Sequence, residues 1–157
     1  VNHGANVISM SFELPASSPG LRQAINYAQN RGVVLVAAAG NDASSATVWP
    51  AGISGVLGIG STSNLDVRST FSNFGSSDVT FAAPGEGVIS TYPGGNYAAG
   101  WGTSFSAPLV AGATVLLQQK NPQGGFSWIM NALDKSAVSV PSMNRGRVDL
   151  YKALLFQ

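Results

Sequence analysis

The sequence predicts an α/β fold of three layers, in which a mostly parallel sheet is covered by helices on both faces. Residues 33–38 form a continuous apolar run of strand length, and such a strand belongs in a parallel sheet that is buried on both sides. A second strand pattern at 6–11, with a helical pattern between the two, completes a βαβ unit. Residues 109–117 are small and apolar all round, which predicts a buried helix.

The first strand, residues 6–11, is expected to be buried and is followed by signals for the start and end of a helix. Ser17 and Ser18 offer an N-cap, and Pro19 suits the first helical position because its missing N–H needs no partner there. Gly32 is a typical C-terminal stop. Between these signals, four apolar residues recur at helical spacing: Leu21, Ala24, Ile25 and Ala28.

Further strands are expected beyond this unit, at 55–60, 79–82 and 88–91. Pro, Gly and Asn residues at 92–96 predict a turn, after which residues 97–101 would return as the second strand of a hairpin. This strand would deliver the chain to Ser104.

Helices are expected to dominate the rest of the chain. The helix at 103–119 has Pro108 in its first turn, where a missing amide is tolerated. Asn121-Pro122 ends this helix. Two more helices should follow, one capped by Ser127 and one capped by Asp149.

Composition and charge exclude several classes of function. The 157 residues suffice for one domain with a core, and a net charge of +1 leaves no basic surface for nucleic acid. No apolar stretch reaches the roughly 18 residues of a membrane helix, so no membrane partner is expected. The absence of cysteine excludes disulfides and thiolate metal sites. Low lysine with abundant Ser, Gly, Asn and Thr favours a secreted protein, and we expect the chain to be a piece of a longer product.

Two polar residues are candidates for chemistry, and each has two interpretations. Ser104 could cap a helix, or it could be a nucleophile at a helix N-terminus, which favours developing negative charge. The crowding of Thr103, Ser104 and Ser106 beside Gly102 favours the nucleophile. Asn41 could be a turn residue, but it follows the strand 33–38 at its carboxyl end, where open α/β sheets bind ligands.

Three motifs resemble those of the subtilisin-like serine peptidases, the subtilases: Ala38-Ala39-Gly40-Asn41, Ala82-Ala83-Pro84-Gly85 and Gly102-Thr103-Ser104-Phe105-Ser106-Ala107-Pro108. The resemblance extends over nearly the whole chain and implies that residues 1–157 are the C-terminal part of a subtilisin-like catalytic domain. It implies a serine endopeptidase in which Ser104 is the nucleophile. The side-chain amide of Asn41 and the backbone amide of Ser104 would bind the oxyanion, and Thr103 would support it.

The resemblance also assigns contacts with a polypeptide substrate. The backbone of Ser11-Phe12-Glu13 would pair with an extended substrate, and Ala38-Ala39-Gly40 would form the opposite wall of the pocket for the residue before the scissile bond. Val48-Trp49 matches the floor of this pocket, which should prefer apolar or aromatic side chains. Glu13 departs from the family, which commonly has glycine there, and this allows a narrowed or an acidic subsite. Asp42 could add negative charge or be a solvated turn residue.

The aspartate and histidine of the family's catalytic triad precede the serine in sequence, and neither is recognisable here. His3 is the single histidine, but it leads into a strand, and no aspartate lies in an Asp-Thr-Gly or Asp-Ser-Gly context. We therefore expect the N-terminal part that carries both residues to be missing and the chain alone to be nearly inert.

The alternative is a non-catalytic peptide-binding or assembly module in which Ser104 is vestigial. The strand at 6–11 would then expose an edge that pairs with the N-terminal half or with a second copy of the chain. No cofactor is expected. Calcium is common in the family, but its ligands usually include loops from the part that is missing here.

Overall fold

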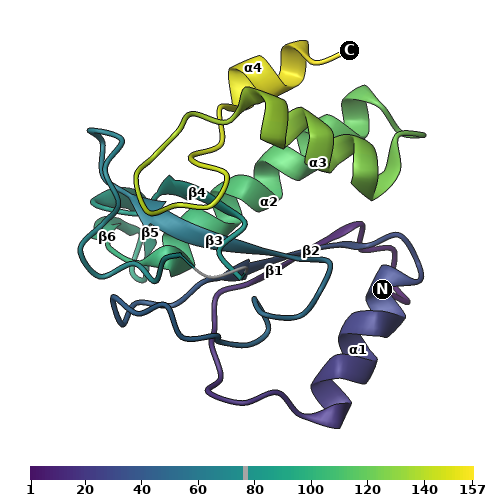
Figure 1. Ribbon diagram of the computed structural model, residues 1–157, viewed down its shortest axis with the longest axis horizontal. Coiled ribbons are helices and arrows are strands. Elements are labelled where there is room, and N and C mark those ends of the chain that lie inside the picture. Colours follow the sequence, from purple (N-terminus) through teal and green to yellow (C-terminus); the bar gives the residue numbers. More distant parts are fainter. Residues whose placement is uncertain (76–77) are drawn as a thin grey trace.

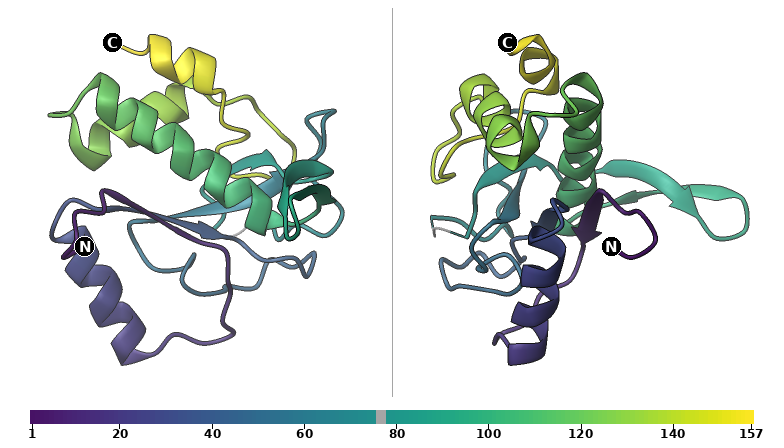
Figure 2. Two further views of the ribbon diagram at one scale, coloured as in Figure 1. Left: turned by 180° about the vertical axis from the view of Figure 1, so that it is seen from behind. Right: turned by 90° about the vertical axis from the view of Figure 1, so that its right-hand side faces the viewer.

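The computed structural model describes residues 1–75 and 78–157. Its central sheet is wholly parallel, and the strands follow one another in space as they do in sequence: β1 (Val7–Met10), β2 (Val34–Ala38), β3 (Val56–Thr62) and β4 (Phe81–Pro84). Two further strands, β5 (Val88–Tyr92) and β6 (Asn96–Gly100), form an antiparallel hairpin that projects from the body of the molecule (Figure 2). β4 thus lies two residues later than the predicted strand at 79–82 and pairs with the end of β3.

Helices cover both faces of the sheet (Figure 1). One face carries α1 (Pro19–Gln29), and the other carries α2 (Thr103–Lys120), α3 (Gly125–Ser136) and α4 (Leu150–Leu155). The alternation of side chains along β2 explains both contacts, because Leu35 and Ala37 belong to the core beneath α1, whereas Val34 and Val36 belong to the core beneath α2 and α3. The predicted three-layer α/β fold is confirmed.

The helix ends follow most of the sequence signals. Ser18 caps α1, which has Pro19 as its first residue, by accepting a backbone N–H at 3.1 Å. Asp149 caps α4 in the same way at 3.0 Å. The prediction that Ser127 caps α3 is wrong. α3 begins at Gly125 with Gly124 as its N-cap, which places Ser127 inside the first turn, where it cannot serve as the cap.

Burial of α2 and of β1 is less complete than their sequences predicted. Val110 and Leu117, on the face of α2 that packs against the sheet, are fully buried. On the other face of α2, three apolar side chains are 43–49% exposed: Leu109, Val115 and Leu116. β1 is only partly buried and lies at one edge of the sheet, whereas at the opposite edge Ala82 of β4 pairs with the segment around Arg147. Within residues 1–75 and 78–157, one face of α2 and one edge of the sheet therefore carry no partner.

Candidate active site

Ser104 lies in the first turn of α2 and is half-buried. The chain enters this turn from β6 through Gly102, whose φ of 139° is rarely adopted by residues with a side chain. The amide of Gly102 donates to the carbonyl of Gly85 at 2.8 Å, which ties the entrance of the helix to the end of β4. Gly102 is the N-cap residue and makes no side-chain cap. The interpretation of Ser104 as the helix cap is therefore wrong.

The carbonyl of Ser104 is held from the end of β1. Ser11 Oγ donates a hydrogen bond to Ser104 O at 2.9 Å. In a regular helix this carbonyl would accept from the amide of the residue four positions later, but that residue is Pro108, which has no N–H. α2 begins at Thr103 as predicted, but Pro108 is the sixth residue from that start and lies inside the helix, so the prediction that it falls in the first turn is wrong. Ser11 thus supplies the donor that Pro108 lacks.

Asn41 is anchored to the residue that precedes Ser104. Its Oδ1 accepts from the backbone amide of Thr103 at 2.9 Å and from Thr103 Oγ1 at 3.1 Å. A backbone N–H can only donate, so the oxygen of the Asn41 amide must be the atom that faces Thr103. The Nδ2 group at the other end of the planar amide keeps its protons for a different acceptor. The amide of Ser104 is a second donor of the same region, since first-turn amides have no partner within their helix.

Thr103 is completely buried, and its hydroxyl makes two contacts. Besides donating to Asn41, Thr103 Oγ1 accepts from the amide of Gly40 at 3.2 Å. Thr103 therefore fixes both the side chain of Asn41 and the backbone before it. Its support of an oxyanion would act through Asn41, and that role stays a prediction.

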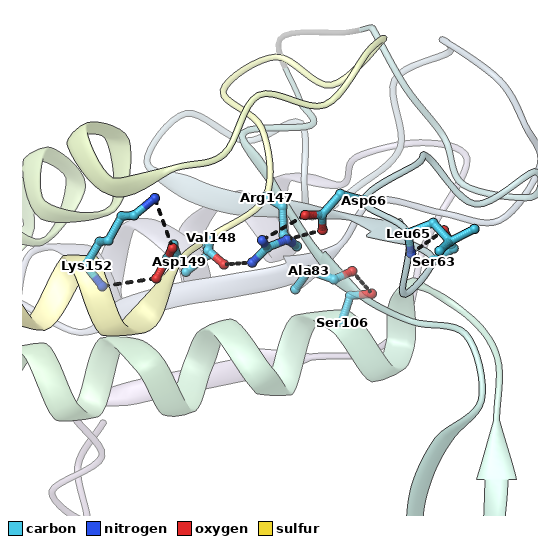
Figure 3. A network of polar contacts seen from close by, with 9 residues as sticks. All are labelled: Ser63, Leu65, Asp66, Ala83, Ser106, Arg147, Val148, Asp149 and Lys152. Carbon is cyan, nitrogen blue, oxygen red and sulfur yellow. Dashed lines mark hydrogen bonds and ion pairs between the residues drawn. The ribbon is translucent and has the colours of Figure 1, made fainter.

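Two buried polar residues hold the same region, one of which, Asn73, was not singled out from the sequence and the other of which, Ser106, was noted there without an assigned contact. Ser106 Oγ donates to the carbonyls of Ala83 (3.0 Å) and Pro84 (3.2 Å), which joins the first turns of α2 to β4 (Figure 3). Asn73 Nδ2 donates to Ala39 O at 2.9 Å. A hydroxyl close before the apolar run of α2 was a signal that could have predicted a buried contact for Ser106. Asn73 lies in a loop without periodicity, and the sequence offers no comparable signal for it.

The two predicted walls of the substrate pocket leave the sheet at the same edge. Met10 and Ala37 are partners in the parallel pair β1 and β2, so the segments that follow them, Ser11-Phe12-Glu13 and Ala38-Ala39-Gly40, start side by side. Phe12 is exposed, whereas Ala38 and Ala39 are buried. The structure brings these residues together, and their contact with a substrate stays a prediction.

The predicted floor of the pocket is tied to the first of these walls. Leu14 and Trp49 exchange two backbone hydrogen bonds, of 2.7 and 3.0 Å. Val48 and Trp49 are half-buried and pack against the core on the α1 side of the sheet. The segment 48–49 therefore lies next to the first wall, and part of its side-chain surface already packs against the core.

Glu13 brings a carboxylate against the second wall. A methyl group added at Gly40 would meet Glu13 Oε2 at 2.2 Å, and Gly40 itself has a φ of +100° that other residues rarely adopt. Burial raises the pKa of the Glu13 carboxyl, and the negative charge of nearby Asp42 raises that pKa further. The carboxylate of Glu13 thus narrows the space beside Gly40 and, with Asp42, makes it acidic.

Comparison with known proteins identifies the family. The chain matches the Subtilase family over residues 1–148. This chain is a subtilase. It is 41% identical to subtilisin BL from Lederbergia lenta over 143 residues, which cover 91% of the chain. It is also 41% identical to thermitase from Thermoactinomyces vulgaris over 157 residues, which cover 99% of the chain. The resemblance seen in the sequence motifs is confirmed.

Solved structures confirm the subtilase fold. The proteases from Pseudoalteromonas arctica match 96% of this chain with a TM-score of 0.90 and 32% identity. The prenylagaramide maturation protease PagA matches 99% of this chain with a TM-score of 0.86 and 28% identity. The subtilase chain spans about half the length of the relatives it matches, 53% of subtilisin BL and 51% of the Pseudoalteromonas chain.

The single histidine and two of the aspartates of this subtilase have other positions in the fold. His3 lines a groove with residues of α1, among them Tyr27. Asp66 holds Arg147 through two hydrogen bonds, and Asp149 caps α4 (Figure 3). Asp66 and Asp149 therefore have structural contacts of their own.

The described ranges, 1–75 and 78–157, contain no group of three or more His, Cys, Asp or Glu side chains that could hold a metal ion. None of the helices in these ranges is long and apolar enough to cross a membrane.

Proposed function

We propose that this chain is the nucleophile-bearing part of a serine endopeptidase that cuts polypeptides through an acyl-enzyme. The observation that carries the proposal is the linkage of Asn41 to the first turn of α2 through Thr103, directly before Ser104. Membership in the subtilase family supports it. The chemistry needs neither a metal nor a cofactor from this chain.

In the proposed reaction, Ser104 Oγ forms a bond to the carbonyl carbon of the substrate and gives up its proton to a base. The carbonyl electrons move onto the oxygen, and Asn41 Nδ2 and the Ser104 amide donate to this oxyanion. Collapse of the tetrahedral intermediate breaks the C–N bond, and the amine leaves with a proton. The ester on Ser104 is then hydrolysed by water.

The base that takes the proton from Ser104 is not evident among the described residues, because His3 lines a groove beside α1. We propose that a histidine and an aspartate are supplied by the half of the fold that the relatives possess and this chain does not span. The chain alone would then be nearly inert, since an unassisted hydroxyl is a weak nucleophile. The composition, poor in lysine, supports a secreted peptidase.

Exposed surfaces support a partner for this chain. Among the described residues, no strand pairs with the outer edge of β1, and α2, which packs on β1, has three exposed apolar side chains: Leu109, Val115 and Leu116. A strand added next to β1 and an apolar segment laid on α2 would cover both. The same edge favours the second candidate function, a peptide-binding or assembly module that pairs through β1 with a partner or a second copy.

The test is labelling of Ser104 by a fluorophosphonate in the peptidase that contains this chain, combined with cleavage of an unfolded protein substrate. We expect Ser104→Ala to abolish both, and Ser139→Ala, at an exposed serine after α3, to leave both unchanged. Peptide binding at micromolar affinity with no labelling, together with a dimer in light scattering, would favour the binding module. Turnover by the isolated chain that Ser104→Ala abolishes would disprove the predicted inertness.

A further inference from the structure

Asn73, in the loop between β3 and β4, is 2% exposed and binds the segment that carries Asn41 on both sides of it. It makes four hydrogen bonds to that segment, two to carbonyls before Asn41 and two from amides after it. They are Asn73 Nδ2 to Ala39 O (2.9 Å), Asn73 N to Gly40 O (3.1 Å), Asp42 N to Asn73 Oδ1 (3.0 Å) and Ser44 N to Asn73 Oδ1 (3.0 Å).

Asn73 packs tightly against this segment. A methyl group added at Gly40 would lie 2.2 Å from Asn73 Nδ2. The side chain of Asn73 therefore packs directly on the backbone of Gly40 and leaves no room for a side chain there. Both ends of the Asn73 amide are used, because Nδ2 donates to one carbonyl and Oδ1 accepts from two amides. A residue of other shape or polarity would leave buried backbone groups unpaired.

Asn41 is therefore held from two directions. Thr103, on α2, binds the end of its side chain, and Asn73 binds the backbone from which this side chain extends. The direction of Asn41 Nδ2 depends on both contacts, since a planar amide turns with the backbone that carries it. In a catalytic site, a misplacement of about 1 Å can cost about 100-fold in rate.

We infer that Asn73 is a positioning residue of the oxyanion hole, which fixes the backbone on both sides of Asn41 and thereby aims the Asn41 amide at the oxyanion. The inference rests on the proposed function. Asn73 touches neither the substrate nor the reacting atoms in this role and acts through Asn41.

The first test uses turnover by the peptidase that contains this chain. Asn73→Leu removes every side-chain hydrogen bond at similar volume, and Asn73→Ser is a milder change should the leucine variant fail to fold. We expect kcat to fall with little change in KM, since the oxyanion exists only after attack. Loss of one oxyanion donor in a serine peptidase lowers kcat by about 100- to 1000-fold, which is the upper limit here.

The same substitution in an enzyme that lacks the Asn41 side chain separates positioning of Asn41 from a general structural role. In the Asn41→Ala enzyme there is no amide to aim, so Asn73→Ser should change kcat by less than about twofold. Ser136→Ala, which removes a buried hydroxyl of α3 that bonds to Leu133 O, is the matched control and should leave kcat unchanged. An equal fall in kcat with and without Asn41, or no fall in either, would overturn the inference.

Hydrogen exchange of the peptidase that contains this chain tests the contact without any turnover. In Asn73→Ser, the amides of Asp42 and Ser44 lose their acceptor and should exchange faster, while the amides of α3 keep their protection. Ser136→Ala should leave both loop amides unchanged. Unchanged exchange in Asn73→Ser, or equal acceleration throughout the chain, would overturn the inference. If the peptidase that contains this chain shows no turnover, the proposed function fails, and faster exchange of these two amides in Asn73→Ser still shows that Asn73 holds the segment that carries Asn41.

Discussion

Ser11→Ala removes the hydroxyl that holds the carbonyl of Ser104 at 2.9 Å. This carbonyl has no amide partner within α2, because Pro108 stands where the donor would be. A hydrogen bond of this kind contributes about 1 kcal/mol net, and the exposure of Ser11 lets water replace part of it. We therefore expect the free energy of unfolding to fall by roughly 0.5–1 kcal/mol.

Urea unfolding followed by tryptophan fluorescence measures this change on the isolated chain. With a slope of about 2 kcal/mol per molar urea, the midpoint should fall by about 0.25–0.5 M. Ser9→Ala is the matched control, since Ser9 is an exposed serine on β1, two residues before Ser11. Its midpoint should stay at that of the parent chain.

A double-mutant cycle tests the reason for the effect. Pro108→Ala restores an amide that can donate to the carbonyl of Ser104, so the hydroxyl of Ser11 becomes redundant. In this background we expect Ser11→Ala to cost less than about 0.3 kcal/mol. An equal cost of Ser11→Ala with proline and with alanine at position 108 would refute the idea that Ser11 replaces the missing amide.

Three further predictions concern stability. Gly85→Ala should lower the urea midpoint by the equivalent of about 1–3 kcal/mol, because its new methyl group would lie 2.3–2.8 Å from three atoms, one of them in Ser106. The pKa of Glu13 is raised by burial and then by the charge of Asp42, so between its ordinary and its raised pKa the folded chain binds more protons than the unfolded chain. The free energy of unfolding should therefore fall as pH rises through this range. Glu13→Gln should flatten this slope in urea midpoints measured across pH. The pKa of Asp149 is lowered mainly by the hydrogen bond that its carboxylate accepts from the backbone N–H of Lys152. Asp149→Ala should therefore lower the free energy of unfolding by about 1 kcal/mol near neutral pH. This loss should shrink as the carboxyl is protonated at low pH, and the same urea midpoints across pH measure it.

Much of the fold was predictable because its signals are local. The apolar run of β2 can only be covered on both faces, and Ser18-Pro19 and Asp149 act on amides of their own first turns. The prediction for Ser127 failed because two glycines before it leave the start of α3 open to more than one position. The complete burial expected for α2 failed because burial depends on what packs on a helix, and its sequence shows only that both faces are apolar.

The motifs around Ser104 and Asn41 were enough to identify the subtilase family, since they combine residue types and order that few other folds share. They also indicated a nucleophile and an oxyanion donor, because a serine at a helix entrance and an asparagine after a parallel strand are chemically suited to those roles. By itself, then, the sequence determined the layers, the family and the two central residues of the candidate site.

Only the tertiary structure decided how these two residues are held. Ser11 and Ser104 are 93 positions apart, and Asn73 and Ala39 are 34 positions apart, yet each pair shares a hydrogen bond. Periodicity and capping signals describe the faces and ends of single elements and carry no information on which side chain meets which carbonyl in another element. That choice depends on how the sheet, α2 and the loop around Asn73 pack together, and packing is a property of the whole chain.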